Sequence, residues 1–199
     1  MAESSGPEPP LGITQLSSVD RVVVRQKSYA GCKYEVLTSD GRVILHARDD
    51  TTALGQLLGG TNRAFNIDVM DTQDRPIAKL RRPYTVGSDK MEVWVTGKLA
   101  SVVRQEVTFL KPVLSVNDAG DKPLYRVKGP VDTANDTDFE VFSLSKKKVG
   151  AIKRKWGRSR EAPADTDSFH IHFPKDLDVR YKAALVGVCF LIDFLFYGS

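Results

Sequence analysis

Two histidines one residue apart, His170 and His172, have the spacing that places two imidazoles on one face of a β-strand. Imidazole nitrogens bind zinc, so this pair supplies half of a possible metal site. The chain of 199 residues has one further histidine, His46, and two cysteines, Cys32 and Cys189, without a cysteine-rich knuckle. Because a zinc site needs three or four protein ligands, we interpret the pair as surface or structural histidines.

A basic segment precedes these histidines. Between Lys146 and Arg160 the chain has eight basic residues and no acidic one, although its net charge is only +4. Such a segment predicts attraction to anionic lipid headgroups, while a nuclear-import signal for an import receptor and a merely solvated hairpin stay open as alternatives. Nucleic-acid binding is disfavoured because only one aromatic residue is interleaved. The candidate lipid-binding residues are Lys146, Lys147, Lys148, Lys153, Arg154, Lys155, Trp156, Arg158 and Arg160.

The rest of the sequence gives no sign of bond chemistry. It has no nucleophile elbow, Walker loop or dinucleotide-binding fingerprint, so we do not expect an enzyme. Two cysteines and no signal peptide favour a reducing compartment. The proline-containing residues 1–11 predict a disordered tail, and residues 12–199 predict one folded domain.

The most apolar element is predicted to be a helix from about Leu177 to Tyr197, capped by Asp176 or Asp178. Over its last fifteen residues Asp193 is the only charged one. A helix that is apolar on every side is either a membrane span or a core helix. Fifteen residues reach about 22 Å, less than the ~30 Å of a bilayer core, and a carboxylate inside a span is costly. We therefore expect the helix to be buried in protein, with Asp193 paired to a polar group.

Strands must supply the protein around this helix. Turn residues such as Ser39-Asp40-Gly41 separate neighbouring strands and predict a hairpin meander. Closing such a sheet into a barrel hides its edges, and a barrel of about twelve strands has an interior wide enough to hold a helix. The twelve segments with β-type alternation lie near residues 20–26, 33–38, 42–48, 64–70, 76–81, 91–96, 100–109, 112–117, 122–128, 138–144, 148–155 and 167–173.

The last sixty residues are similar to the C-terminal signature of the phospholipid scramblase family. The similarity is carried by Asp165–Val179, by the helix Lys182–Phe196, and by the strand segments Phe139–Leu144 and Val149–Trp156. Weaker similarity extends it to residues 11–198. The resemblance implies a mainly β, tubby-like fold, a twelve-stranded closed antiparallel barrel around a buried C-terminal helix. It also implies a protein at the cytoplasmic face of the plasma membrane that moves phospholipids between leaflets non-specifically when calcium binds.

The resemblance implies a calcium-binding segment as well. Calcium takes about six to eight oxygen ligands. The three apolar members of the segment alternate as on a half-buried strand and carry no side-chain oxygen, and the EF-hand pattern is absent. We therefore expect either a weak, water-rich Ca²⁺ site or a plain strand flanked by turn carboxylates. The segment maps onto Asp165, Asp167, Phe169, Ile171, Phe173 and Asp176.

Two departures from the family pattern keep a second function open. The proline-rich region is short here, and the stretch Thr85–Met91 lacks the cysteines that many members carry for palmitoylation. The alternative is a non-scrambling, tubby-like module that binds anionic lipid or protein partners at the membrane or in the nucleus. The C-terminal signature favours scrambling, whereas the missing cysteines and short tail favour the binding module.

Overall fold

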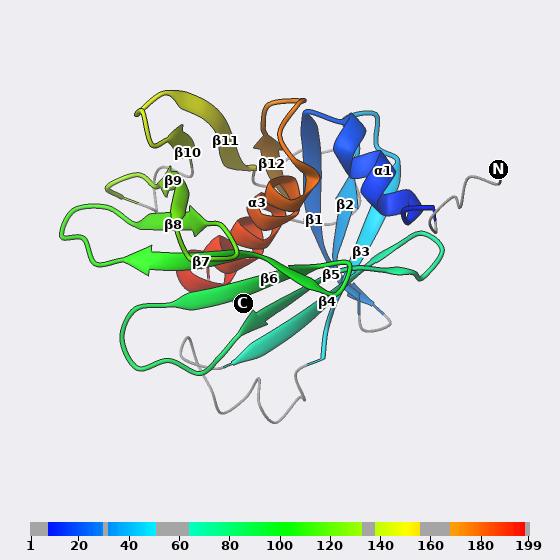
Figure 1. Cartoon of the computed structure of the whole chain (residues 1–199), viewed down its shortest axis with the longest axis horizontal. Helices are drawn as coiled ribbons and strands as arrows, with labels where there is room; N and C mark the ends of the chain where they lie inside the picture. Colours follow the sequence, from blue (N-terminus) through cyan, green and yellow to red (C-terminus); the bar gives the residue numbers. More distant parts are fainter. Residues whose placement is uncertain (1–7, 30–31, 51–63, 133–137, 156–167, 198–199) are drawn as a thin grey trace, which may run out of the picture.

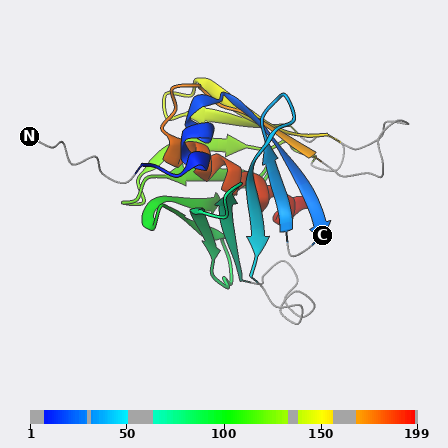
Figure 2. The same ribbon diagram turned by 90° about the vertical axis from the view of Figure 1, so that its right-hand side faces the viewer.

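A computed structural model describes residues 8–29, 32–50, 64–132, 138–155 and 168–197 of the chain. In these residues twelve antiparallel strands close into a barrel around a single long helix (Figures 1 and 2). The fold class predicted from the strand pattern and from the family resemblance is confirmed.

Each predicted strand has a counterpart, with ends shifted by at most three residues. The largest differences are at the ends of β1, which continues to Tyr29, and of β7, which ends at Glu106, so the prediction that β7 continues to residue 109 is wrong. The strands are β1 (Arg21–Tyr29), β2 (Cys32–Leu37), β3 (Val43–Asp49), β4 (Phe65–Asp71), β5 (Pro76–Arg82), β6 (Lys90–Val95), β7 (Lys98–Glu106), β8 (Val113–Asn117), β9 (Pro123–Lys128), β10 (Asp138–Ser143), β11 (Lys148–Lys155) and β12 (Ser168–His172).

Each strand pairs with the next along the chain, and β12 closes the barrel by pairing with β1. In that last pair Arg21 lies opposite His172. Closure leaves none of the twelve strands with an unpaired edge. The β2–β3 hairpin uses the predicted turn, in which Gly41 has φ of +86°, a conformation that side chains with a Cβ rarely adopt.

Helix α3 (Val179–Ile192) fills the barrel and continues as a π-helical turn, η2 (Asp193–Tyr197). Of the two predicted caps, Asp178 is the one that accepts the amide of Arg180, at 2.9 Å. All residues from 182 to 192 are buried. A Cβ on Gly187 would lie 3.1 Å from Leu80 and Met91, so this glycine lets the helix approach the wall. No helix in the described part of the chain has the length and apolarity to cross a bilayer.

A short helix, α1 (Leu11–Ser18), covers the barrel end at which α3 begins. The sequence analysis did not anticipate it. Leu16 is completely buried against the core, and a Cβ on Gly12 would come within 2.8 Å of Asp71. The helix therefore packs directly on the barrel mouth and not beside it.

The meander places its connections alternately at two ends of the barrel. The α1 end carries α1, the start of α3 and the turns β2–β3, β4–β5, β6–β7, β8–β9 and β10–β11. The C-terminal end carries η2 and the described loops 83–89, 107–112 and 129–132. In Figure 2 the α1 end is on the left, and the helix runs from there to the C-terminal end on the right.

Candidate functional site

The C-terminal helix carries its one acidic residue inside the barrel. Asp193 is 3% exposed, and its carboxylate accepts a 2.6 Å hydrogen bond from the hydroxyl of Tyr34 on β2. The ring of Tyr34 stacks on Phe190 of α3, with centroids 4.3 Å apart. Burial, and then the charge of Asp193, raise the pKa of Tyr34 well above its ordinary value, so the hydroxyl stays a donor. The polar partner predicted for Asp193 is therefore present.

Two arginines from the barrel wall face the last turn of this helix, which has no basic residue of its own. The guanidinium of Arg82 lies 4.7 Å from the ring of Phe194 and pairs with buried Asp89. The guanidinium of Arg154 lies 4.0 Å from the ring of Tyr197. Cations at a helix C-terminus complement its dipole, and guanidinium–ring contacts add to this. Lipid binding by Arg154 would therefore compete with a structural contact.

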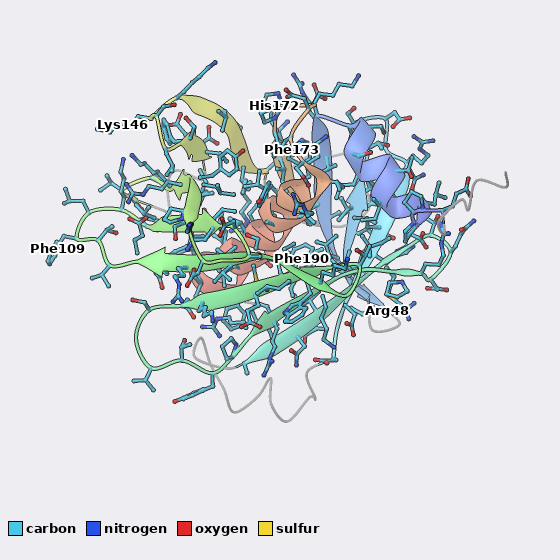
Figure 3. The ribbon with its side chains drawn as sticks, in the orientation of Figure 1. Arg48, Phe109, Lys146, His172, Phe173 and Phe190 are labelled. Carbon is cyan, nitrogen blue, oxygen red and sulfur yellow. The ribbon has the colours of Figure 1, made fainter. Side chains whose placement is uncertain are left out.

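The segment matched to a calcium site lies partly in the core. The side chains of Phe169, Ile171 and Phe173 are at most 4% exposed, and each packs in the barrel interior. Figure 3 places Phe173 beside the start of α3. These three positions anchor β12 and the β12–α3 turn and supply no side-chain oxygen.

The described structure contains one of the three carboxylates of the same segment. Asp176 is exposed in the β12–α3 turn at the α1 end. Asp165 and Asp167 lie outside the described residues, and the first described residue after them, Ser168, begins β12 at the opposite end of the barrel. The strand separates Ser168 from His172 by about 13 Å. Within the described residues Asp176 is thus the one carboxylate of this segment, and the predicted calcium ligand set stays a prediction.

The predicted basic segment is also divided between the two barrel ends. Lys146, labelled in Figure 3, and Lys147 lie in the exposed β10–β11 turn, which the strand order places at the α1 end. Lys155 ends β11 at the C-terminal end. The seven residue steps along β11 separate Lys148 from Lys155 by about 23 Å. The other three candidates, Trp156, Arg158 and Arg160, lie outside the described residues.

Ion pairs with the neighbouring strand neutralise part of this charge. Lys148 pairs with Glu140 at 2.6 Å, and Lys153 pairs with Asp138 at 2.5 Å, both across the β10–β11 pairing. Surface pairs of this kind contribute little to stability, but they reduce the net charge presented to a ligand. Lys146, Lys147 and Lys155 remain as the exposed lysines of the segment for which such a pair does not occur in the described structure.

His170 and His172 lie on the outer face of β12, because they alternate with buried Phe169 and Ile171. The third histidine, His46, is on β3, which β1 and β2 separate from β12. Burial, and then the positive charge of Lys155, lower the pKa of His170. Within the described residues, no three His, Cys, Asp or Glu side chains form a metal-binding group.

Lys182 makes structural hydrogen bonds that the sequence did not predict. It is completely buried, and its ammonium donates to the carbonyl oxygens of Ser17 and Val19 at the end of α1, at 2.8 and 2.7 Å. A third bond of 2.7 Å reaches the carbonyl of Lys175. The ammonium thus caps α1 and joins it to the start of α3. A lysine among the apolar residues of a buried helix was the available signal.

Exposed apolar loops at the C-terminal end were missed as well. Phe109 is fully exposed at the tip of the β7–β8 loop, which projects at the left of Figures 1 and 3. Val86, in the β5–β6 loop, is 90% exposed. Between the two loops lies an open groove of about 510 Å³, bordered by Gly87, Leu110 and Phe196 of η2. The adjacent apolar pair Phe109 and Leu110, followed by Lys111 and Pro112, was the available signal.

Together, these features define the class of the protein as a twelve-stranded barrel closed around its own C-terminal helix. Comparison with known proteins identifies the family to which the chain belongs. A model of the Scramblase family matches residues 7–199. Human phospholipid scramblase 1 is 31% identical over 219 aligned residues, which cover 97% of this chain and 69% of that protein. Phospholipid scramblase 2 of Bos taurus is 31% identical, with 96% of this chain and 74% of that protein covered. The chain belongs to the phospholipid scramblase family.

Two less similar proteins also match most of this chain, one in sequence and one in fold. Human phospholipid scramblase family member 5 is 28% identical, covering 94% of this chain and 78% of that protein. An X-ray structure of a protein from Arabidopsis thaliana superimposes with a TM-score of 0.55 over 87% of this chain and 91% of that one. Its sequence identity is 16%, so this likeness shows the shared fold alone.

Proposed function

We propose that this chain moves phospholipids between membrane leaflets, without lipid selectivity and without making or breaking covalent bonds. The observation that carries the proposal is the family match over residues 7–199, which includes the whole barrel and its central helix. The relatives at 31% identity are named phospholipid scramblases. This function requires the protein to act at a membrane.

Charge supports a cytoplasmic membrane face as the place of action. An exposed lysine such as Lys155 contributes about 1 kcal/mol of attraction when it lies near an anionic leaflet. The plasma membrane exposes anionic lipids on its cytoplasmic side. We therefore propose anionic phospholipids as the lipids that hold the chain at the membrane.

The barrel interior is not the proposed route for lipids in this conformation. Helix α3 occupies it, and a void beside the helix, lined by Leu16, Leu80 and Ala183, has a volume of about 10 Å³. Such a void hardly admits one water molecule, far less a phospholipid headgroup. The proposed movement therefore takes place at the outer surface of the barrel or requires the helix to move.

Calcium dependence is part of the proposal, with a narrower set of ligands. Asp165 and Asp167 are the family-matching carboxylates that precede β12 in the sequence, two residues apart. Asp176 would act at a separate place, because β12 lies between it and Asp167. When bound, calcium would supply positive charge that attracts lipid phosphate groups. The affinity expected of so few carboxylates is weak.

The second candidate function is a binding module that does not scramble. The filled interior favours it, as does the absence of cysteines from Thr85–Met91. Such a module would bind anionic lipid or a protein partner at the membrane, or enter the nucleus through the basic segment. It differs from the first candidate in leaving the lipid distribution of a vesicle unchanged.

Reconstitution of the full chain into liposomes with a fluorescent lipid in both leaflets separates the two functions. A membrane-impermeant reductant removes the fluorescence of the outer leaflet only, so scrambling appears as loss of the protected inner fraction. We expect this loss in liposomes that contain the protein, and we expect calcium to accelerate it. Retention of the inner fraction in liposomes with folded, incorporated protein would establish the binding module instead.

A further inference from the structure

The exposed apolar residues of the C-terminal end belong to two adjacent loops. The β5–β6 loop exposes Tyr84 and Val86, and the β7–β8 loop exposes Val107, Phe109 and Leu110, each by more than 60% of its surface. The amide of Gln105 donates to the carbonyl of Asp89 at 2.8 Å, which holds the bases of the two loops together. The five side chains therefore project from the same end of the barrel.

The two loops carry almost no charge of their own. Residues 83–88 contain no charged side chain, and residues 107–112 contain Lys111 and no acid. The acidic residues that border the loops are both paired with arginine, Asp89 with Arg82 and Glu106 with Arg126. The loop tips thus present apolar surface and one cation.

The basic strand β11 ends at the same side of the barrel. Lys155 is exposed there, whereas Lys146 and Lys147 lie at the α1 end. Apolar tips with lysines at the same end of the barrel match the chemistry of a bilayer interface, where apolar side chains enter the acyl boundary and ammonium groups meet lipid phosphates. The structure brings the two kinds of residue to one end.

We propose that the β5–β6 and β7–β8 loops dock this protein on an anionic bilayer, with Val86, Phe109 and Leu110 entering the interface. The proposal rests on the membrane action proposed above and assigns its surface and orientation. In this orientation the C-terminal end of the barrel faces the membrane, and α1 faces away from it. Lys111 and Lys155 meet the headgroups.

The shape of the surface favours a bilayer over a folded protein partner. Phe109 stands at the end of a projecting hairpin loop (Figure 3), where a flat protein surface would contact little more than the tip. A fluid interface closes around such a tip. Backbone groups of the loops, which lack strand partners, keep their hydrogen bonds to water and headgroups if the tips enter only about 5–10 Å.

Sedimentation of the full chain with sucrose-loaded vesicles tests the docking surface. The vesicles contain phosphatidylcholine alone or with a minority of phosphatidylserine. The Phe109→Ser/Leu110→Ser double variant should bind the mixed vesicles at least about tenfold more weakly than the wild type, because two apolar contacts are lost. The matched control is Leu144→Ser, which removes an exposed leucine at the α1 end and should leave binding unchanged.

A label on the loop gives a second measurement that does not depend on a weakened variant. A polarity-sensitive fluorophore on Thr108→Cys should shift to the blue with mixed vesicles, and one on Ser145→Cys should not. The labelled chains carry Cys32→Ser, and Cys189 is buried. A shift at Ser145 but not at Thr108 overturns the proposed orientation.

Unchanged binding of the folded Phe109→Ser/Leu110→Ser variant overturns the proposal. Absence of vesicle binding by the folded wild type overturns it too, and leaves the loops to a protein partner. Failure of the lipid-movement proposal is a separate result: the wild type then binds mixed vesicles through these loops but leaves the protected fluorescent lipid in the inner leaflet.

Discussion

Tyr34 and Asp193 connect the second strand of the barrel to the last turn of its helix through a 2.6 Å hydrogen bond across 159 residues of sequence. Both side chains are almost completely buried, with 2% and 3% of their surfaces exposed. A buried carboxylate is costly unless it is hydrogen-bonded, so the bond favours the helix inside the barrel. Any state in which α3 leaves the barrel must first break it.

Replacing Tyr34 by Phe tests this connection. The variant keeps the ring that stacks on Phe190 but removes one hydrogen bond from the carboxylate of Asp193. We expect the free energy of unfolding in urea to fall by about 1–3 kcal/mol, the range for a buried acceptor that loses a partner. Tyr125→Phe is the control: it removes a half-buried hydroxyl elsewhere and should change stability by less than about 0.5 kcal/mol. Equal losses in both variants would contradict the role given to the bond.

Lys182 should matter chiefly for α1. Lys182→Met keeps most of the apolar stem but leaves the carbonyl oxygens of Ser17 and Val19 without the ammonium. We expect hydrogen exchange to accelerate at the amides of residues 11–18 more than in the barrel strands, because α1 loses its cap. Lys175→Met, which alters an exposed lysine nearby, should leave α1 unchanged. Uniform acceleration over all strands would show that Lys182 acts on the barrel as a whole.

The pKa of His170 provides a pH-dependent test of β12. Burial and the charge of Lys155 lower this pKa from 6.5, so the unfolded chain binds the proton more readily than the folded one. The native state therefore loses stability as the pH falls below the unfolded value. Lys155→Gln should raise the pKa of His170 in an NMR titration, while Lys147→Gln at the far end of β11 should not. An unchanged pKa in Lys155→Gln would show that burial alone lowers it.

The sequence predicted the features that depend on patterns among neighbouring residues better than those that depend on contacts between distant residues. The twelve strands were found from alternation along each segment, and the buried helix from its length and from Asp193. Turn residues placed most strand ends to within two positions. The place of the helix inside the barrel followed because no other element could cover it. The strands and turns follow from local sequence patterns, and the position of the helix follows from the need to bury its apolar surface.

Other features depend on contacts that no local pattern contains. The eight basic residues look like one patch in sequence, yet a strand of eight residues separates Lys148 from Lys155. The role of Arg154 is set by Tyr197, which is more than forty residues later in the chain. Helix α1 has little apolar periodicity, and the ammonium of Lys182 supplies its cap from another element. Alternation also led the prediction of β7 too far, into the exposed loop 107–112.

The two halves of the basic segment should contribute unequally to membrane binding. With the C-terminal end toward the bilayer, Lys155→Glu should weaken binding to phosphatidylserine-containing vesicles by roughly tenfold, since reversal of one charge removes about 1 kcal/mol and adds repulsion. The Lys146→Glu/Lys147→Glu variant should bind nearly as well as the wild type. Lys153 and Arg154 are left unchanged because Asp138 and Tyr197 contact them.

Salt provides the control for this charge effect. Binding of the wild type should decrease as ionic strength rises, and the difference between the wild type and Lys155→Glu should decrease with it. A larger loss of binding in Lys146→Glu/Lys147→Glu would place the α1 end against the membrane. Binding that is equal in all three proteins would leave nuclear import or simple solvation as the roles of the basic segment.

The calcium proposal makes different predictions for the carboxylates on the two sides of β12. Titration calorimetry of the wild type should show weak binding, in the range of about 10⁻⁴–10⁻³ M that loose sites have. Asp165→Ala and Asp167→Ala should each reduce this signal. Asp176→Ala should retain it, because β12 separates the turn of Asp176 from Ser168. Asp74→Ala, which removes an exposed turn carboxylate at the α1 end, is the matched control.

The calorimetric signals of these variants distinguish three possible locations or fates of the calcium site. Loss of the signal in Asp176→Ala alone would place the ion in the β12–α3 turn and contradict the assignment to Asp165 and Asp167. A signal that survives all three substitutions would place the site on another part of the chain. Absence of a signal even at millimolar calcium would identify the segment as a strand between two turns. Its apolar residues Phe169, Ile171 and Phe173 would then explain the signature by core packing, and the non-scrambling binding module would become the preferred function.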